Sequence, residues 1–286
     1  MAGALLVAGC GEAPPSRQDA VPTQAASFIG AAAGDKAMQL AHGERVSAIM
    51  GCTGCHGDRL QGNDFGAFIP LLDGLWATNI SRTLPDMSDA ELERLLREGV
   101  HPDREIYLMP SKQSQFLSEA DMEALVAYLR TFPPTGEPSP LPPEGFEERV
   151  SAQLPDDYWA KQLEDPRFHY HNAQEEAGHF RDNQPPELGE EHALGRYVAL
   201  TVCSGCHGAA LDGVGEPAGS MAVAARYDEG AMRALMMDSR MLDGTTIESP
   251  WTGAPGHVTD GLTEEEKLAA GAYARAWAAW KAKQGD

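Results

Sequence analysis

Residues 52–56 read Cys-Thr-Gly-Cys-His and residues 203–207 read Cys-Ser-Gly-Cys-His, so the pattern C-x-x-C-H occurs twice in the 286-residue chain. The first cysteines of the two motifs are 151 residues apart. The cysteine pairs of a zinc ribbon are separated by only about 15–20 residues, so one shared metal ion does not fit this spacing. A thioredoxin-like redox pair would leave both histidines without a role, and no βαβ pattern surrounds either motif.

C-x-x-C-H is the attachment signature of c-type haem. The two thiols lie one helical turn apart, so that each can add to one vinyl group of a single porphyrin, and the following histidine then lies under the iron as its proximal ligand. The sequence therefore predicts two covalently bound haem c groups. The predicted attachment residues and proximal ligands are Cys52, Cys55, His56, Cys203, Cys206 and His207.

The sequence around the two motifs also repeats. Residues 43–46 (Gly-Glu-Arg-Val) lead into the first motif, and residues 195–198 (Gly-Arg-Tyr-Val) lead into the second. Each motif is followed by a glycine, then by a short loop that reaches a Leu-x-Gly sequence. This is an internal duplication.

Each copy then carries a helix with an acidic start, expected at residues 117–130 and 262–275. Ser118 and Thr263 are favourable N-caps, and an acidic residue follows each of them three positions later, close to a capping box. The spacing of leucine, alanine and tyrosine places apolar side chains on one face of each helix.

With these motifs, the chain resembles a tandem class I cytochrome c over residues 38–135 and 189–283. The resemblance implies an all-α fold of two small domains, in each of which an N-terminal helix ending in C-x-x-C-H crosses the C-terminal helix beside the haem. Residues 136–188 are then an acidic, Pro-rich linker, and residues 1–37 a lipoprotein-type signal with a flexible tether. Three runs in the first copy look like diheme cytochromes that serve periplasmic dehydrogenases: Trp76 to Ile80, Met87 to Leu92, and Met109-Pro110.

The resemblance also implies a distal iron ligand in the first copy. Met109 lies between two expected helices, next to a proline, at the place where the family carries its distal methionine. Met87 and Met122 have positions that favour the core. A thioether ligand favours ferrous iron and raises the reduction potential.

The second copy has no methionine at the matching place, where Pro250 and Trp251 stand. Three alternatives remain: His257 in the longer loop that follows, Met241 from the preceding loop, or an open iron. We favour His257, which would give a haem of lower potential. Met232, Met236 and Met237 have helical spacing and are expected in the core.

The N-terminus resembles a bacterial lipoprotein signal, because a short apolar run ends in Ala8-Gly9-Cys10. In that reading Cys10 carries the lipid. Only nine residues precede Cys10 and none is basic, whereas an export signal has a basic start. The alternative is an unpaired cysteine in a frayed tail. We expect a protein of the bacterial cell envelope, on the periplasmic face and held to the membrane only by a lipid anchor.

Composition indicates an acidic, folded chain. It is 42% hydrophobic, and its 22 basic against 43 acidic side chains give a formal charge of −21. Nucleic-acid binding needs clustered Lys and Arg, so we exclude a nucleic-acid partner and expect redox partner proteins with a basic docking patch. Residues 136–191 alone carry 14 acidic and 4 basic side chains. We interpret this segment as a solvated connector, which is compatible with a role as an acidic docking strip. Its histidines have no zinc-site spacing and are interpreted as surface residues.

The function that these features favour is electron transfer: a diheme c-type cytochrome that passes single electrons between a periplasmic dehydrogenase or respiratory donor and an acceptor. The alternative is a haem enzyme, a diheme peroxidase or a sulfur-compound oxidase, with an open or labile second haem. Its support is the missing methionine in the second copy. A purely structural subunit is the least favoured, because it leaves a redox centre on a tether unexplained.

Overall fold

The computed structural model describes the chain from residue 26 to residue 285 with several gaps. The described residues are 26–31, 34–67, 70–106, 109–146, 149, 152–153, 172–213, 219–247 and 259–285. Within these ranges the regular structure is helical, and β pairing is limited to two isolated bridges, Asp64–Trp76 and Arg240–Thr246. The predicted all-α fold class is confirmed.

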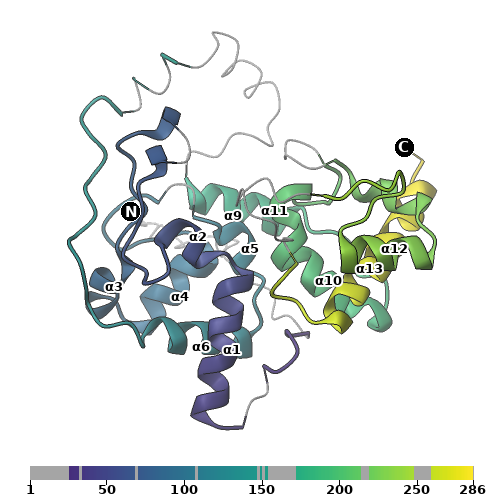
Figure 1. The fold of residues 1–286 in the computed structure, drawn as a ribbon, viewed down its shortest axis with the longest axis horizontal. Helices are drawn as coiled ribbons and strands as arrows, with labels where there is room; N and C mark the ends of the chain where they lie inside the picture. The colour runs from purple at the N-terminus through teal and green to yellow at the C-terminus, as the bar shows by residue number, and fades with distance from the viewer. Residues whose placement is uncertain are drawn as a thin grey trace, which may run out of the picture.

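Two helical lobes lie side by side, the first formed by α1 to α6 and the second by α10 to α13 (Figure 1). The α-helices of the first lobe are α1 (Lys36–Ile49), α2 (Cys52–His56), α3 (Ile80–Thr83), α4 (Asp89–Glu98), α5 (Ser111–Ser114) and α6 (Glu119–Leu129). In the described part of this lobe they are accompanied by the short 3₁₀ helices η1 (Phe65–Ala67), η2 (Pro70–Leu72) and η3 (Leu84–Asp86).

Among the residues that the structure describes, the second lobe repeats the plan of the first, with fewer elements between the motif and the last helix. Its elements are the 3₁₀ helix η5 (Glu190–His192), α10 (Ala193–Val198), the π-helix η6 (Ala199–Cys203), α11 (Ser204–His207), the 3₁₀ helix η7 (Met221–Arg226), α12 (Glu229–Asp238) and α13 (Glu264–Lys283). In both lobes the helix that leads into the motif packs against the last helix, α1 on α6 and α10 on α13.

One glycine permits the close helix crossing in each lobe. A Cβ atom at Gly43 would collide with the carbonyl oxygen of Ala124 and lie 2.7 Å from Cβ of Tyr128. At Gly195 it would collide with the carbonyl oxygen of Ala269 and lie 2.7 Å from Cβ of Tyr273. The two repeats therefore share the same crossing, residue for residue.

The starts of the two last helices also match the expectation from sequence. The Ser118 side chain accepts from the backbone N–H of Asp121, and that of Thr263 accepts from the N–H of Glu266. In α13 the Glu266 carboxylate returns a bond to the Thr263 backbone, which completes a capping box. Both predicted N-caps are confirmed.

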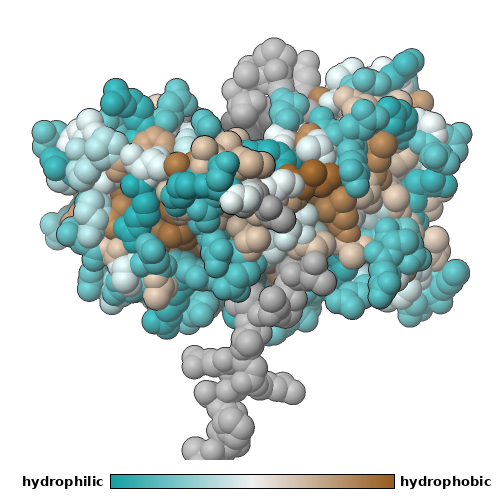
Figure 2. Space-filling view, turned by 90° about the horizontal axis from the view of Figure 1, so that it is seen from below, coloured by the Kyte–Doolittle hydropathy of each residue, from teal (hydrophilic) through white to brown (hydrophobic). Residues whose placement is uncertain are grey.

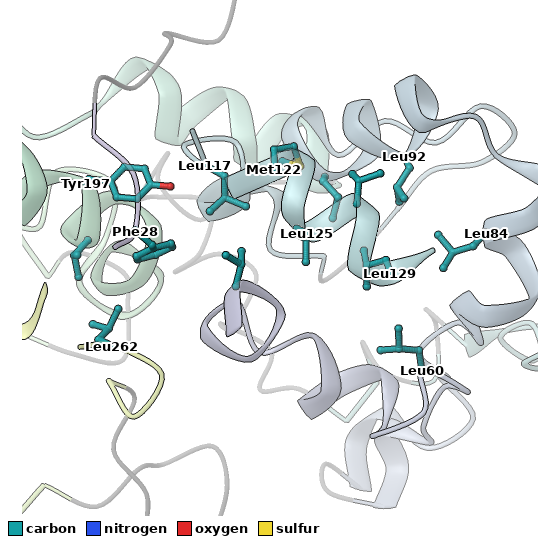
Figure 3. Packing of buried hydrophobic residues seen from close by; sticks show 14 of the residues in the cluster. Phe28, Leu60, Leu84, Leu92, Leu117, Met122, Leu125, Leu129, Tyr197 and Leu262 are labelled. Carbon is teal, nitrogen blue, oxygen red and sulfur yellow. The ribbon is translucent and has the colours of Figure 1, made fainter. Parts of the chain in front are cut away.

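One hydrophobic cluster runs through both lobes, and the second lobe also has a separate cluster around Tyr273 and Trp277. Figure 3 shows the shared cluster running from Leu262 and Tyr197 of the second lobe, past Phe28, to Leu125 and Leu129 of the first. Phe28 is 1% exposed and its ring meets that of Tyr197 edge to face at 5.0 Å. The described residues just before α1 thus fill the junction between the lobes.

The same short segment is tied to both last helices through its backbone. The N–H of Phe28 donates to Asp121, and the N–H of Ile29 donates to Glu266. These carboxylates are fully buried and occupy equivalent positions at the starts of α6 and α13. Segment 27–29 therefore joins the two repeats at the place where each last helix begins.

The last part of the predicted linker differs from the solvated connector that its charge suggested. Helix α9 (Ala173–Asp182) packs against α4 and α5 of the first lobe and buries Ala177 and Phe180. Phe180 joins a small cluster with Phe116 of the first lobe and Leu200 of the second. The acidic residues of α9 dominate its composition, but its apolar face is buried and contacts both lobes.

Hydrophilic residues cover most of the face shown in Figure 2, and apolar residues are exposed between them in patches on both halves of this face. Among the described residues, no helix combines the length and apolar character that a membrane span requires. The predicted lipidation residue, Cys10, lies outside the described residues.

Candidate haem-binding sites

The proximal histidine of the first motif is held in one orientation. Nδ1 of His56 lies 2.8 Å from the carbonyl oxygen of Thr78. A carbonyl oxygen can only accept, so Nδ1 carries the proton and Nε2 keeps its lone pair for a metal. Burial lowers the pKa of His56 and favours the neutral imidazole, although the bond to Thr78 acts in the opposite direction. A neutral ring with a free Nε2 is what an iron ligand requires.

The second motif repeats this arrangement. Nδ1 of His207 lies 2.6 Å from the carbonyl oxygen of Gly219, which leaves Nε2 of that ring available. Burial likewise lowers the pKa of His207. In both predicted proximal ligands, Nδ1 therefore donates to a backbone carbonyl oxygen, and the two rings are the same tautomer.

The four motif cysteines are free thiols. Burial raises the pKa of Cys52 and Cys55, and it raises the pKa of Cys203 to about 12. Burial thus favours the neutral thiol at Cys52, Cys55 and Cys203, and none of the four motif cysteines forms a disulfide. Within the described residues, no group of three or more His, Cys, Asp and Glu side chains could hold a metal ion by itself.

The loop after each motif has the same backbone in both lobes. Leu60 and Leu211 adopt positive φ angles of 57° and 63°, and both side chains are fully buried. The next glycine, Gly62 or Gly213, donates to the carbonyl of the motif histidine at 2.8 Å in each case. The loop thus fixes the histidine backbone in the same way in each lobe.

The Pro-rich segment after the first lobe braces the acceptor of the first histidine. The Ser139 hydroxyl accepts from the N–H of Asn79 at 2.8 Å and donates to the carbonyl of Ala77 at 2.9 Å, so it spans the residue Thr78. The Asn79 side chain in turn donates to the carbonyls of Thr135 and Glu137. No local pattern marks Ser139 as a site residue, because its partners are about 60 residues away in the chain.

Met109 is half-buried, packs against the shared core, and stands just before Pro110 and α5. The backbone carbonyl of Met109 accepts from the N–H of Ser111. The thioether sulfur is the atom of this residue that could bind iron. Met87 and Met122 are 9% and 1% exposed, which confirms the prediction that they belong to the core.

The distal side of the second site is only partly described. Pro250, Trp251 and His257 lie outside the described residues, so His257 stays a prediction. Met241 is half-buried and begins a tight turn in which its N–H donates to Thr245 at 2.8 Å. Of the three methionines expected in the core, Met232 is 5% exposed and belongs to it, Met236 is half-buried against it, and Met237 is half-buried.

In each described motif, the donor set fits haem c: two cysteine thiols outside any disulfide and one oriented imidazole, preceded by a helix and followed by a fixed loop. A zinc site would need four ligands around one point, which neither motif supplies.

Comparison with known proteins agrees with this reading for the first lobe. Residues 40–133 match the family model described as Cytochrome c, which covers the first C-x-x-C-H motif and Met109. No curated protein matches the chain. The first lobe is therefore a cytochrome c domain, a type of domain that binds haem c covalently and carries electrons.

Proposed function

With a cytochrome c domain at residues 40–133 as the premise, we propose that the whole chain is a diheme electron carrier, with one covalent haem c in each lobe. The observation that carries this proposal is the matching geometry of His56 and His207, whose Nδ1 atoms each donate to a backbone carbonyl after the motif. The common crossing at Gly43 and Gly195 supports the same reading.

Bound haem supplies an iron that alternates between the ferrous and ferric states, so each site takes up or gives away one electron. In each lobe, two cysteines attach the porphyrin and the histidine is the proximal ligand. In the first lobe Met109 is the proposed distal ligand. In the second we propose His257, with Met241 or an open position as the alternatives. The protein contributes orientation and burial, because both imidazoles are held by backbone acceptors rather than by mobile side chains.

The proposed partners are a periplasmic dehydrogenase or respiratory donor and a separate acceptor. A formal charge of −21 supports a basic docking patch on at least one partner. In the cell, we propose a place on the periplasmic face of the bacterial envelope, with Cys10 as the lipidated residue. Electron transfer to a basic partner should slow as salt is raised, because the Debye length falls from about 10 Å at 0.1 M salt to about 3 Å at 1 M.

The test of this function is a reductive titration of the purified holoprotein in the absence of oxygen. A diheme carrier takes up two electrons per chain, and its reduced form passes them to a one-electron acceptor. A haem enzyme with an open second site behaves differently: its oxidised form binds cyanide rapidly, and its reduced form turns over with peroxide. Rapid cyanide binding together with peroxide turnover would overturn the carrier proposal.

A further inference from the structure

The side chain of Gln113 connects the two candidate haem sites. Gln113 belongs to α5, four residues after Met109, and its Nε2 donates to the carbonyls of Thr201 and Val202 at 3.1 and 3.0 Å. These two carbonyls belong to the π-helix η6, which ends at Cys203. The chain that follows the proposed distal ligand of the first site therefore bonds directly to the helix that carries the first attachment cysteine of the second site.

The Gln113 amide also covers the turn between the two cysteines of the second motif. A Cβ atom on Gly205 would lie 2.5–2.7 Å from three atoms of the Gln113 carboxamide. Gly54 holds the equivalent place in the first motif, and a Cβ atom there would meet nothing within 4 Å. The attachment turn of the second site is thus closed by the other lobe, while that of the first site is open.

Neighbouring contacts surround this junction with apolar side chains. Met109, Val202 and Cys203 are partly buried against the shared core cluster. On the other side, Phe116 and Leu200 are fully buried in the small cluster that includes Phe180. The Gln113 side chain is half-buried, and its amide donates to two carbonyls, which determines its position.

We propose that Gln113 is a positioning residue of the second haem site. Its amide fixes the backbone on the N-terminal side of Cys203, packs on Gly205, and keeps water from the attachment turn. This proposal rests on the diheme function proposed above, since it assigns a role toward the second haem. It adds a physical asymmetry between two sites whose motifs are almost identical.

The asymmetry has a direction. Water near a haem stabilises the ferric form, which carries one more positive charge than the ferrous form, and so lowers the reduction potential. Removing the Gln113 cover should therefore lower the potential of the second haem and leave the first unchanged. It should also loosen the backbone of residues 199–206.

The experiment compares three variants of the full holoprotein. Gly205→Ala places a methyl group where the Gln113 amide lies, and Gln113→Leu removes both donors, so that the carbonyls of Thr201 and Val202 must take water as their partner. Gly54→Ala is the matched control, because it makes the same change in the open motif. Haem is counted first in each protein, and the two potentials are then measured by an optical redox titration.

With two haems bound, we expect Gly205→Ala and Gln113→Leu to lower the potential of one haem, and Gly54→Ala to leave both at their wild-type values. Hydrogen exchange of the peptide that covers residues 199–206 should be about tenfold faster in the first two variants, which corresponds to about 1.4 kcal/mol. A general loss of structure would instead move both potentials together.

Unchanged potentials in both Gly205→Ala and Gln113→Leu, with two haems bound, would overturn the role of Gln113 and leave the diheme proposal intact. A single haem in the wild-type protein would overturn the diheme proposal instead. If the wild-type protein holds a single haem, hydrogen exchange still tests the contact between Gln113 and the second motif. Unchanged exchange in Gly205→Ala and Gln113→Leu would show that Gln113 does not position this motif.

Discussion

The hydroxyl group of Tyr197, in the second lobe, donates a 2.5 Å hydrogen bond to Oδ2 of Asp121, in the first lobe. Asp121 is fully buried, and it has three further partners: the N–H of Phe28, the hydroxyl of Ser118, and Nε2 of His42. One carboxylate therefore joins the chain before α1, α1 itself, the start of α6, and the second lobe.

Replacing this carboxylate should cost more than replacing the hydroxyl. Asp121→Asn puts an amide NH₂ in place of an acceptor among donors, and we expect a loss of about 2–4 kcal/mol in the free energy of unfolding. For Tyr197→Phe we expect about 1–2 kcal/mol. Urea unfolding of the holoprotein measures both values.

The matched control is Glu98→Gln, which makes the same acid-to-amide change in the exposed pair of Glu98 with Arg94. This variant should lose less than about 0.5 kcal/mol. If Asp121→Asn is as stable as Glu98→Gln, then Asp121 does not hold the lobes together.

Tyr197 should also make the protein sensitive to alkali. Burial, reinforced by the neighbouring Asp121, raises the pKa of Tyr197 well above its usual range. The native state then holds the phenolic proton more tightly than the unfolded state does. The stabilisation is complete below the unfolded pKa of about 10 and is lost as the pH rises from there toward the higher native value.

The contribution of Tyr197 to the free energy of unfolding should therefore be constant from neutral pH to about pH 9, and should fall above about pH 10. Tyr197→Phe should fall less steeply over the same range. Parallel curves for the wild type and the variant above pH 10 would show that another group causes the alkaline loss.

The glycines at the two helix crossings should be intolerant of a methyl group. Gly43→Ala and Gly195→Ala each force Cβ into a backbone carbonyl oxygen, which can relax only if the helices separate. We expect each substitution to cost about 3 kcal/mol or more, the range of severe overpacking. Thermal unfolding of the holoprotein measures the effect.

Gly178→Ala is the control for this pair, because Gly178 lies inside helix α9 and a Cβ atom there would approach no neighbour closer than 3.9 Å. Alanine has the higher helix propensity, so this variant should gain up to about 1 kcal/mol. If Gly43→Ala and Gly195→Ala are as stable as the wild type, the helices do not cross as closely as described at these glycines.

The two haems should differ in their distal ligands. Met109→Ala should abolish the far-red absorption band of methionine bound to ferric iron. His257→Ala should turn the second haem high-spin and leave that band in place. If a methionine band instead disappears on Met241→Ala, Met241 is the second ligand and the two potentials should lie closer together.

The local parts of the fold could be predicted from sequence, because each depends on neighbouring residues. C-x-x-C-H places two thiols and an imidazole within five residues. Ser118 and Thr263 are N-caps, and each is followed three residues later by the acidic residue whose backbone N–H it accepts from. The repeat of Gly43 and Gly195 before the motifs was visible as well. The structure adds the reason, a crossing too close for any side chain.

The junction between the lobes could not be predicted in the same way. Tyr197 and Asp121 are 76 residues apart, and Gln113 lies 88 residues before its acceptor Thr201. A tyrosine or glutamine at such positions has no local signature, since its partner is set by the packing of whole helices. The acidic composition around α9 concealed its role for a related reason: net charge describes the solvent face of a helix and says nothing about the residues packed beneath it.

The most direct test of the central claim is a count of covalent haem. The purified protein is denatured and extracted with acidified acetone, and the haem left on the polypeptide is measured by its pyridine haemochrome spectrum and by intact mass. We expect two haems per chain, falling to one when Cys203 and Cys206 are both replaced by serine. A wild-type chain that retains only one haem, at Cys52 and Cys55, would contradict the claim that the second motif is a haem site.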